Sequence, residues 1–169
     1  MDSNIKKLFK MKQKHFIDSH KGATGIFILC LIFYFDAWEN INALVYLAIH
    51  GSYGLMWIMK SMIFPDKTWE QQCTLFYGLY IWCGLTLYWI SPYIIIANNI
   101  NNSPQFIAIS IFVFILGVFF HFTSDMQKFT HLKLKPGQLI EDGMMYRSRN
   151  MNYFGELLIY LSFLMLAYH

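Results

Sequence analysis

The sequence predicts an all-α, polytopic membrane protein with about five transmembrane helices, its N-terminus inside and its C-terminus outside. Of its 169 residues, 56% are hydrophobic, 19% are aromatic and only 14% are charged, a composition that excludes a disordered chain and argues against a water-soluble enzyme. Long apolar runs recur along the chain. The thirteen Lys and Arg residues are confined to three stretches of the chain, and this distribution predicts the topology.

Five apolar runs are the predicted membrane spans. Four of them are clear and cover residues 41–64, 73–97, 104–122 and 153–168, since a span needs roughly 20 mostly apolar residues. The first run, residues 23–35, is short and reaches only about 20 Å as a helix. It crosses the bilayer only if Phe16, Ile17 and Trp38 extend it and Asp36 lies at the interface.

Two local signals mark helix boundaries and a bend. Ser103 followed by Pro104 is typical of an N-cap and a first helical residue, so a helix should begin there. Residues 98–102 then form a tight uncharged loop. Ser91 and Pro92 predict a kink in the third span, which membrane helices tolerate when neighbouring groups satisfy the freed carbonyl.

The distribution of basic residues fixes the orientation of the five spans. Two acidic residues, Asp36 and Glu39, lie in one of the intervening loops, and the other loop is uncharged. With five spans, all three basic segments share one side, which is the inside by the positive-inside rule. The basic residues are Lys6, Lys7, Lys10, Lys12, Lys14 and Lys21 before the first span, Lys67 between the second and third with Lys60 at the boundary of the second, and Lys128, Lys133, Lys135, Arg147 and Arg149 between the fourth and fifth.

The chain divides into a basic N-terminal segment, residues 1–22, and a single transmembrane domain, residues 23–169, with a polar inside loop at residues 123–152. In the first segment Ile5, Leu8 and Phe9 share one helical face opposite lysines. This segment could be a solvated basic face, a surface-bound amphipathic helix or a targeting sequence.

The polar stretch that begins at His121 and ends at Glu156 is the candidate functional region. Its five basic residues suit a polyanion such as a dinucleotide, although an ordinary inside loop has the same charge. Glu156 lies within an apolar helix, where an ionisable group suggests function, unless it pairs with Arg147 or Arg149. Asn152 lies one turn earlier on the same face.

These residues carry a resemblance to a known family. Ser124, Asp125, Gln127 and Lys128, then Pro136, Gly137 and Gly143, and the run RNMNYFGELLIYLSF at residues 149–163 resemble the C-terminal core of the steroid 5α-reductase-like membrane family. The match is to a branch whose signature is close to RNPNYLGE. The second span agrees, with HGSYGLMWIMK at residues 50–60 and FPD at residues 64–66.

The resemblance implies a helical fold with an NADPH pocket that opens to the inside face. Asn152 and Glu156 would hold the nicotinamide end, and Asp125 would form a hydrogen bond within the pocket. Tyr53 resembles the catalytic tyrosine that polarises the substrate carbonyl. The residues that would face the cofactor phosphates are Lys128, Lys133, Lys135 and Arg149.

The chain also departs from the family pattern. Met151 stands where the signature has proline, and the chain stops at His169, so we expect the closing hairpin and basic tail of the reductases to be missing. Glu39 lies on the opposite side in the predicted topology, so the catalytic glutamate of the steroid reductases has no counterpart. Such a site should bind poorly and react slowly, because hydride transfer needs tight positioning and exclusion of water.

Two functions from different classes follow. The first is a vestigial or non-catalytic subunit of a larger membrane assembly, with a residual nucleotide or lipid pocket and contacts to other membrane subunits. The alternative is an NADPH-dependent reductase of a C=C bond in a sterol or other isoprenoid lipid; a methyltransferase uses the same general motif.

Other functions have less support. A haem protein would need two histidines at one depth, which His50 and His121 do not provide. The three cysteines lack metal spacing, and nucleic-acid binding is not predicted. We expect the membrane to be that of an intracellular organelle, with the endoplasmic reticulum and the mitochondrial inner membrane as the two alternatives.

Overall fold

The structure is a computed structural model that describes residues 11–168. The amphipathic pattern of residues 1–10 lies outside the described residues, as does His169. The helices are α2 (Gln13–Tyr34), α3 (Ile41–Ile63), α4 (Leu75–Leu85), η1 (Thr86–Trp89), α5 (Ile90–Ala97), α6 (Pro104–Leu134), η2 (Gly143–Met145) and α7 (Met151–Leu166), and the short strands are β1 (Met11–Lys12) and β2 (Gln72–Cys73).

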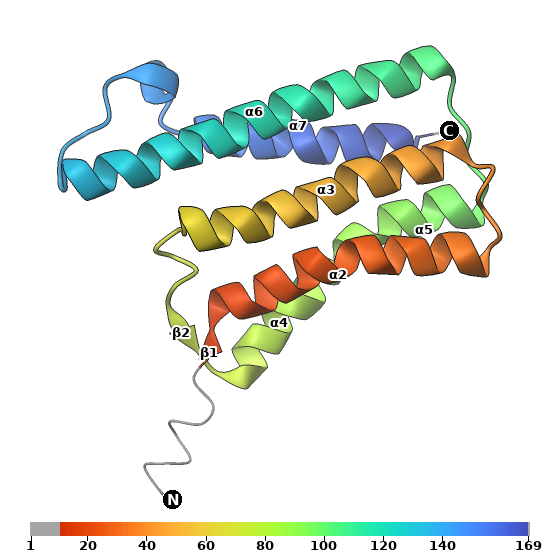
Figure 1. The fold of residues 1–169 in the computed structure, drawn as a ribbon, viewed down its shortest axis with the longest axis horizontal. Coiled ribbons are helices and arrows are strands. Elements are labelled where there is room, and N and C mark those ends of the chain that lie inside the picture. Colours follow the sequence, from red (N-terminus) through yellow and green to blue (C-terminus); the bar gives the residue numbers. More distant parts are fainter. Residues whose placement is uncertain (1–10, 169) are drawn as a thin grey trace, which may run out of the picture.

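Length and composition confirm the all-α membrane fold. Four helical segments are long and apolar enough to cross a membrane: α2, α3, the Leu75–Ala97 segment and α6. The fifth, α7, is a shorter apolar helix that reaches about 24 Å at 1.5 Å per residue. It lies along α6 in Figure 1, and its residues Ile159, Phe163 and Leu166 belong to the hydrophobic core.

The third span is broken where the sequence predicts a kink. A 3₁₀ turn, η1, separates α4 from α5, and Pro92 lies in the first turn of α5. Proline lacks the N–H that a helix interior requires, and 3₁₀ turns commonly absorb such an interruption.

The first span is longer than the apolar run, and its expected C-terminal extension is wrong. Helix α2 begins ten residues before residue 23 and ends at Tyr34, so Trp38 lies outside it. It also passes through the expected boundary at residue 22. The helix can include the polar residues before the apolar run because the bundle accommodates their side chains. His20 and Lys21 are buried, and Asp18 accepts a hydrogen bond from Ser61 of α3.

Side-chain caps begin three of the helices. Ser103 Oγ accepts a hydrogen bond from Phe106 N at 3.3 Å, as predicted for the start of α6. Asn40 Oδ1 accepts from Ala43 N at 2.9 Å at the start of α3. Thr74 Oγ1 accepts from Tyr77 N at 3.3 Å at the start of α4. Each cap satisfies a backbone N–H that has no partner within its helix.

The connections gather at two opposite ends of the bundle. In Figure 1 the α3–α4 and α6–α7 connections lie at one end with the start of α2, and the α2–α3 and α5–α6 connections lie at the other. Asn40 Nδ2 donates to Asn99 Oδ1 at 2.9 Å at the second end. Asp66 and Lys133 line one cavity at the first end. The described residues therefore alternate direction as five spans require.

Helices α6 and α7 approach closely at two glycines. A Cβ atom on Gly117 would lie 2.8 Å from the carbonyl oxygen of Gly155, and a Cβ on Gly155 would lie 2.7 Å from the carbonyl oxygen of Gly117. Small residues allow helices to pack backbone to backbone in a membrane. This contact brings His121 and Asp125 of α6 beside the first turn of α7.

Candidate functional site: a buried polar cluster and an adjoining cavity

A buried ion pair joins the C-terminal end of α3 to the C-terminal half of α6. Lys60 Nζ lies 2.5 Å from Asp125 Oδ2, and the two side chains are only 5% and 6% exposed. The ammonium group also lies 4.6 Å from the ring centroid of Trp57. Asp125, the residue that the resemblance places in the cofactor pocket, is therefore already neutralised by a lysine of the second span.

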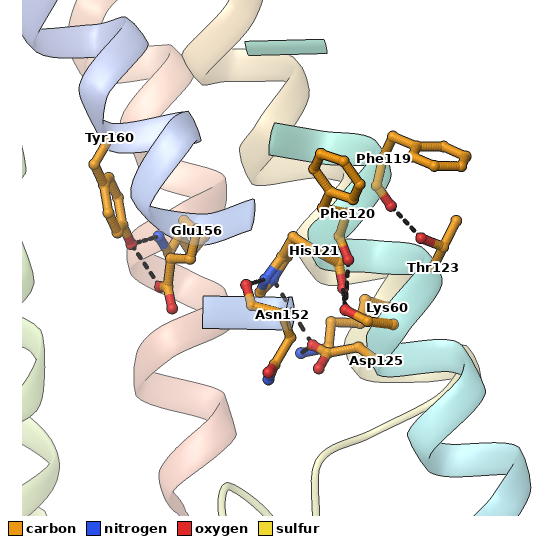
Figure 2. Close-up of polar contacts among 11 residues, drawn as sticks. Lys60, Phe119, Phe120, His121, Thr123, Asp125, Asn152, Glu156 and Tyr160 are labelled. Carbon is orange, nitrogen blue, oxygen red and sulfur yellow. Dashed lines mark hydrogen bonds and ion pairs between the residues drawn. The ribbon is translucent and has the colours of Figure 1, made fainter. Parts of the chain in front are cut away.

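His121 connects this pair to α7. Its Nε2 lies 3.8 Å from Asp125 Oδ2, and its Nδ1 lies 3.1 Å from the backbone oxygen of Asn152. Since a carbonyl oxygen can only accept, we assign the Nδ1 proton to this hydrogen bond. Figure 2 shows Lys60, Asp125, His121 and Asn152 in one continuous group.

A second buried lysine lies among aromatic rings. Lys21 of α2 is 3% exposed, and its Nζ lies 4.6 Å from the ring centroid of Tyr53 and 5.1 Å from that of Trp57. The rings of Tyr88 and Tyr160 lie at 5.3 and 5.6 Å. Cation–π attraction offsets part of the cost of burying the ammonium group.

Glu156 is held by a tyrosine of its own helix. Tyr160 Oη donates to Glu156 Oε1 at 3.0 Å and accepts from Lys21 Nζ at 3.4 Å. Figure 2 shows the Glu156 and Tyr160 side chains together on α7. No ion pair joins Glu156 to Arg147 or Arg149 within residues 11–168, so the alternative role of an interface pair is not observed.

Tyr53 lies at the centre of the bundle, and its side chain is 0% exposed. Its hydroxyl has no hydrogen-bond partner among the described residues. The ring centroids of His121 and Tyr160 are 6.4 and 6.5 Å from that of Tyr53. An unpartnered buried hydroxyl is costly, and such groups deserve a functional explanation.

A partly open cavity of about 510 Å³ adjoins the ion pair, a size typical of small-molecule sites. It lies between the end of α3, the following loop and the last turns of α6. The lining residues are Lys60, Phe64, Pro65, Asp66, Lys67, Thr68, Glu70, Asp125, Lys128, Phe129, Leu132 and Lys133.

Hydrogen bonds and nearby lysines lower the pKa of one carboxylate that lines the cavity. Partial burial raises the pKa of Asp66, but hydrogen bonds from Thr68 and the charges of Lys128 and Lys60 outweigh it, so the pKa lies below its usual value. The backbone N–H of Thr68 donates to Asp66 Oδ1 at 2.8 Å. The Thr68 hydrogen bonds, assisted by the two lysines, therefore favour the ionised form of Asp66.

The predicted site residues fall into separate groups. Lys128, Lys133 and Asp125 line the cavity. Lys135 lies just beyond α6 and Arg149 lies in the α6–α7 connection; both are exposed and neither lines the cavity. The two predicted nicotinamide contacts, Asn152 and Glu156, lie on the first turns of α7, away from that lining.

Sequence reasoning did not predict that Lys21, Lys60 and His20 are buried inside the bundle. Lys21 counted only as a topology signal, and Lys60 only as a topology signal and the last residue of the second-span motif, although Lys60 lies within α3, three residues before its end. His20 is 1% exposed, and both of its ring nitrogens lack a partner among residues 11–168. Its ring stacks on that of Trp89, with 4.9 Å between the ring centroids. A lysine inside an apolar helical pattern was the available signal.

Comparison with known proteins assigns most of the chain to a family. Residues 60–169, from the buried Lys60 onward, match the family described as "Protein of unknown function (DUF1295)". No curated protein and no solved structure matches the chain. The matched segment contains the cavity-lining residues, the ion pair and all of α7. The chain belongs to this family, which is related to steroid 5α-reductase-like proteins.

Proposed function

We propose that this protein is a small integral-membrane subunit of a larger membrane assembly, a non-catalytic member of its family that retains a pocket for a phosphate-bearing ligand. The position of Lys21 carries the proposal. Its ammonium group lies 4.6 Å from the Tyr53 ring centroid, and Tyr53 is 0% exposed, so a substrate carbonyl could reach the Tyr53 hydroxyl only if the bundle opened around a buried charge. Hydride transfer to a substrate requires a site that admits it in a fixed orientation.

The polar residues do not fit a complete dinucleotide in the cavity. Asp125 is paired with Lys60, and Glu156 is bonded to Tyr160. The lysines of the cavity suit phosphate groups, but Asn152 and Glu156 do not share that cavity. This separation supports retention of an anion site without the reductase reaction.

The third span supports a role as a subunit. Only 17% of its most apolar window is buried, compared with 44% for α3, and Gly78 is the only buried residue of α4. Phe76 and Tyr80 on α4 are 85% and 74% exposed. A neighbouring membrane subunit that packs on α4 would bury these aromatic rings.

A native-gel experiment tests the subunit role. Organelle membranes are solubilised in mild detergent, and the chain should migrate with an assembly much larger than 20.0 kDa. Replacement of Phe76 and Tyr80 by alanine should release it. The matched control, Phe33→Ala, removes an aromatic side chain that is 78% exposed on α2 and should leave the assembly intact. Migration of the unaltered chain as a monomer would contradict the proposal.

The reductase alternative is favoured by one observation, the buried Tyr53 hydroxyl without a partner. A free donor at a dry position could stabilise negative charge on a substrate oxygen. Purified protein is therefore mixed with NADPH and an enone lipid. The subunit proposal expects negligible NADPH oxidation, whereas turnover that is lost in both Tyr53→Phe and Glu156→Gln would establish the reductase.

Fractionation of the same membranes addresses the compartment. The two locations that we propose are the endoplasmic reticulum and the mitochondrial inner membrane. Co-fractionation of the chain with marker proteins of one of them decides between the two.

A further inference from the structure

We infer that the cavity between the end of α3 and the last turns of α6 binds the phosphate headgroup of an anionic membrane lipid, with Lys67, Lys128 and Lys133 as its cationic partners. This inference rests on the proposed function, since it names the ligand class of the retained pocket. It is carried by the charge pairing around the cavity, by the position of the cavity along α6 and by the apolar part of its lining.

Only one of the four lysines that line the cavity forms an ion pair within residues 11–168. Lys60 is bound to Asp125, and Glu70 is bound by Lys12 and Lys14, which do not line the cavity. Lys67, Lys128 and Lys133 form no ion pair within residues 11–168. Asp66 is then the one lining carboxylate without an ion-pair partner in that part of the chain. Three lysines facing one carboxylate leave an excess of two positive charges.

That excess matches a phosphate monoester. Such a group carries about −1.5 to −2 charge near neutral pH, and lysines bind phosphate as point charges without demanding one geometry. Lys60 and Asp125 line the cavity as a buried ion pair, so the anion would lie beside the other three lysines, between the α3–α4 loop and α6.

The position of the cavity favours a lipid. Helix α6 has 31 residues and is therefore about 46 Å long, whereas the hydrocarbon core of a bilayer is about 30 Å thick. Its last turns, which carry Lys128 and Lys133, extend past that core to the level of the headgroups. Basic pockets at this level between transmembrane helices are typical sites for anionic lipids.

The apolar part of the lining gives the same result. Phe64, Pro65, Phe129 and Leu132 line the cavity beside the lysines. An inorganic phosphate ion would gain nothing from these side chains. A lipid would place its phosphate against the lysines and its glycerol and upper acyl carbons against the apolar residues, and burial of apolar surface adds to the affinity.

Native mass spectrometry of the detergent-purified chain tests the inference. Phosphatidate with dioleoyl chains and phosphatidylcholine with the same chains are titrated separately. We expect phosphatidate to bind about tenfold or more tightly, because each lysine near the headgroup adds about 1 kcal/mol of attraction. A large excess of inorganic phosphate should not displace it.

Variants then locate the lipid. Replacing Lys128 and Lys133 together by alanine should abolish the preference for phosphatidate. The same pair replaced by glutamine keeps longer side chains and should give the same loss, and an unchanged melting temperature of either double variant ensures that folding is not the cause. The control Lys135→Ala removes an exposed lysine that lies just beyond α6 and should keep the preference.

Three results would overturn the inference. These are equal binding of the two lipids, an equal loss in Lys135→Ala, and displacement of phosphatidate by inorganic phosphate, which would indicate a free-phosphate site. Failure here is distinguishable from failure of the proposed function. An assembly that persists on native gels without phosphatidate preference removes the lipid inference alone, whereas a lipid-selective monomer removes the subunit role alone.

Discussion

Lys60 Nζ and Asp125 Oδ2 lie 2.5 Å apart inside the protein and join the second transmembrane helix to the fourth. His121 Nε2 lies 3.8 Å from the same carboxylate oxygen, and its Nδ1 bonds the backbone oxygen of Asn152 on α7. The ion pair thus joins α3 to α6, and His121 continues the polar cluster to α7. Both residues of the pair also line the cavity of the candidate site. The same contact therefore holds the helices together and shapes that cavity.

The first prediction concerns this ion pair. Lys60→Met leaves Asp125 buried without its partner, which should lower the free energy of unfolding by about 3–5 kcal/mol. The double variant Lys60→Met with Asp125→Leu removes both charges and should recover most of the loss. Lys67→Met, at an exposed position, is the control and should change stability by less than about 0.5 kcal/mol.

Unfolding in mixed detergent micelles, followed by circular dichroism, measures these values. If Lys60→Met and the double variant were equally destabilised, the pair would contribute through packing of the lysine stem and not through charge.

The second prediction concerns the contact between α6 and α7. Gly155→Ala would place a methyl group against the backbone of His121 and 2.7 Å from the carbonyl oxygen of Gly117. The helices must separate, and overpacking of this kind costs about 1–3 kcal/mol. Gly84→Ala is the matched control, because a Cβ there meets nothing within 4 Å. A Gly155→Ala protein as stable as the unaltered chain would show that the helices are not held at this distance.

Residue patterns were sufficient to predict most of the fold. The apolar runs predicted the five spans because helix length must match bilayer thickness, and Ser103 and Pro104 predicted the start of α6 because capping is a local interaction. The first span does extend through Phe16 and Ile17 as predicted, but it does not reach Trp38, and it begins earlier than the apolar run indicates. Helix propagation continues through Asp18 and Lys21 once other helices provide hydrogen-bond or aromatic partners for them, and a local apolar count does not include such partners.

Fewer features of the candidate site than of the fold could be predicted from the sequence. Motif similarity selected Asp125, Lys128 and Lys133, which do line one cavity. It could not assign Lys60 to Asp125, because that pairing depends on the relative rotation of α3 and α6. Lys21 was interpreted as a basic residue before the membrane, and only tertiary packing shows its ammonium group among four aromatic rings.

The third prediction concerns the charge of Lys21. Its Nζ has one long hydrogen bond, to Tyr160 at 3.4 Å, and no carboxylate oxygen within 4.0 Å in the part of the chain that the structure describes. Lys21→Met preserves length and removes the charge, so stability should be unchanged or rise by about 1–3 kcal/mol, as for other buried charges replaced by apolar groups. Lys21→Ala leaves a void and should cost about 2–5 kcal/mol.

The same unfolding measurement separates the two effects. Equal destabilisation by Lys21→Met and Lys21→Ala would mean that the aromatic rings require the ammonium group, and cation–π attraction would then exceed the desolvation cost.

The fourth prediction concerns pH and the short sheet that anchors the start of α2. Hydrogen bonds from Lys12 and Lys14 hold the pKa of Glu70 below its usual value. A lowered pKa in the folded state means that the contribution is complete above the unfolded-state pKa of about 4.3. The contribution is lost as the pH falls through the lower folded-state pKa. An ion pair at this partly exposed position contributes about 0.2–1 kcal/mol.

Hydrogen exchange measures this local stability. The amides of Gln13 and Lys14 donate to the carbonyl oxygens of Gln71 and Trp69, and their protection factors should fall on acidification in the unaltered chain. In Glu70→Gln they should be lower at neutral pH and independent of pH in this range. A pH dependence that persists in Glu70→Gln would assign it to another group.

The last prediction concerns the orientation of the chain in the membrane. Glu39 lies in the α2–α3 connection and Lys133 lies near the end of α6, and both are exposed. That connection and that end of α6 lie at opposite ends of the bundle in Figure 1. The basic residues cluster at the end that holds Lys133, so the positive-inside rule places it inside and Glu39 outside. After Cys30, Cys73 and Cys83 are replaced by serine, single cysteines are introduced at positions 39 and 133.

In sealed vesicles of known sidedness, a membrane-impermeant maleimide should modify position 133 only from the inside and position 39 only from the outside. Position 142, in the exposed α6–α7 connection, is the internal control and should behave as position 133 does. Reversed labelling of all three positions would preserve the five spans and invert the orientation, because the helices would still alternate. Labelling of positions 39 and 133 from the same side would contradict the five-span topology itself, since an odd number of crossings separates these two positions in it.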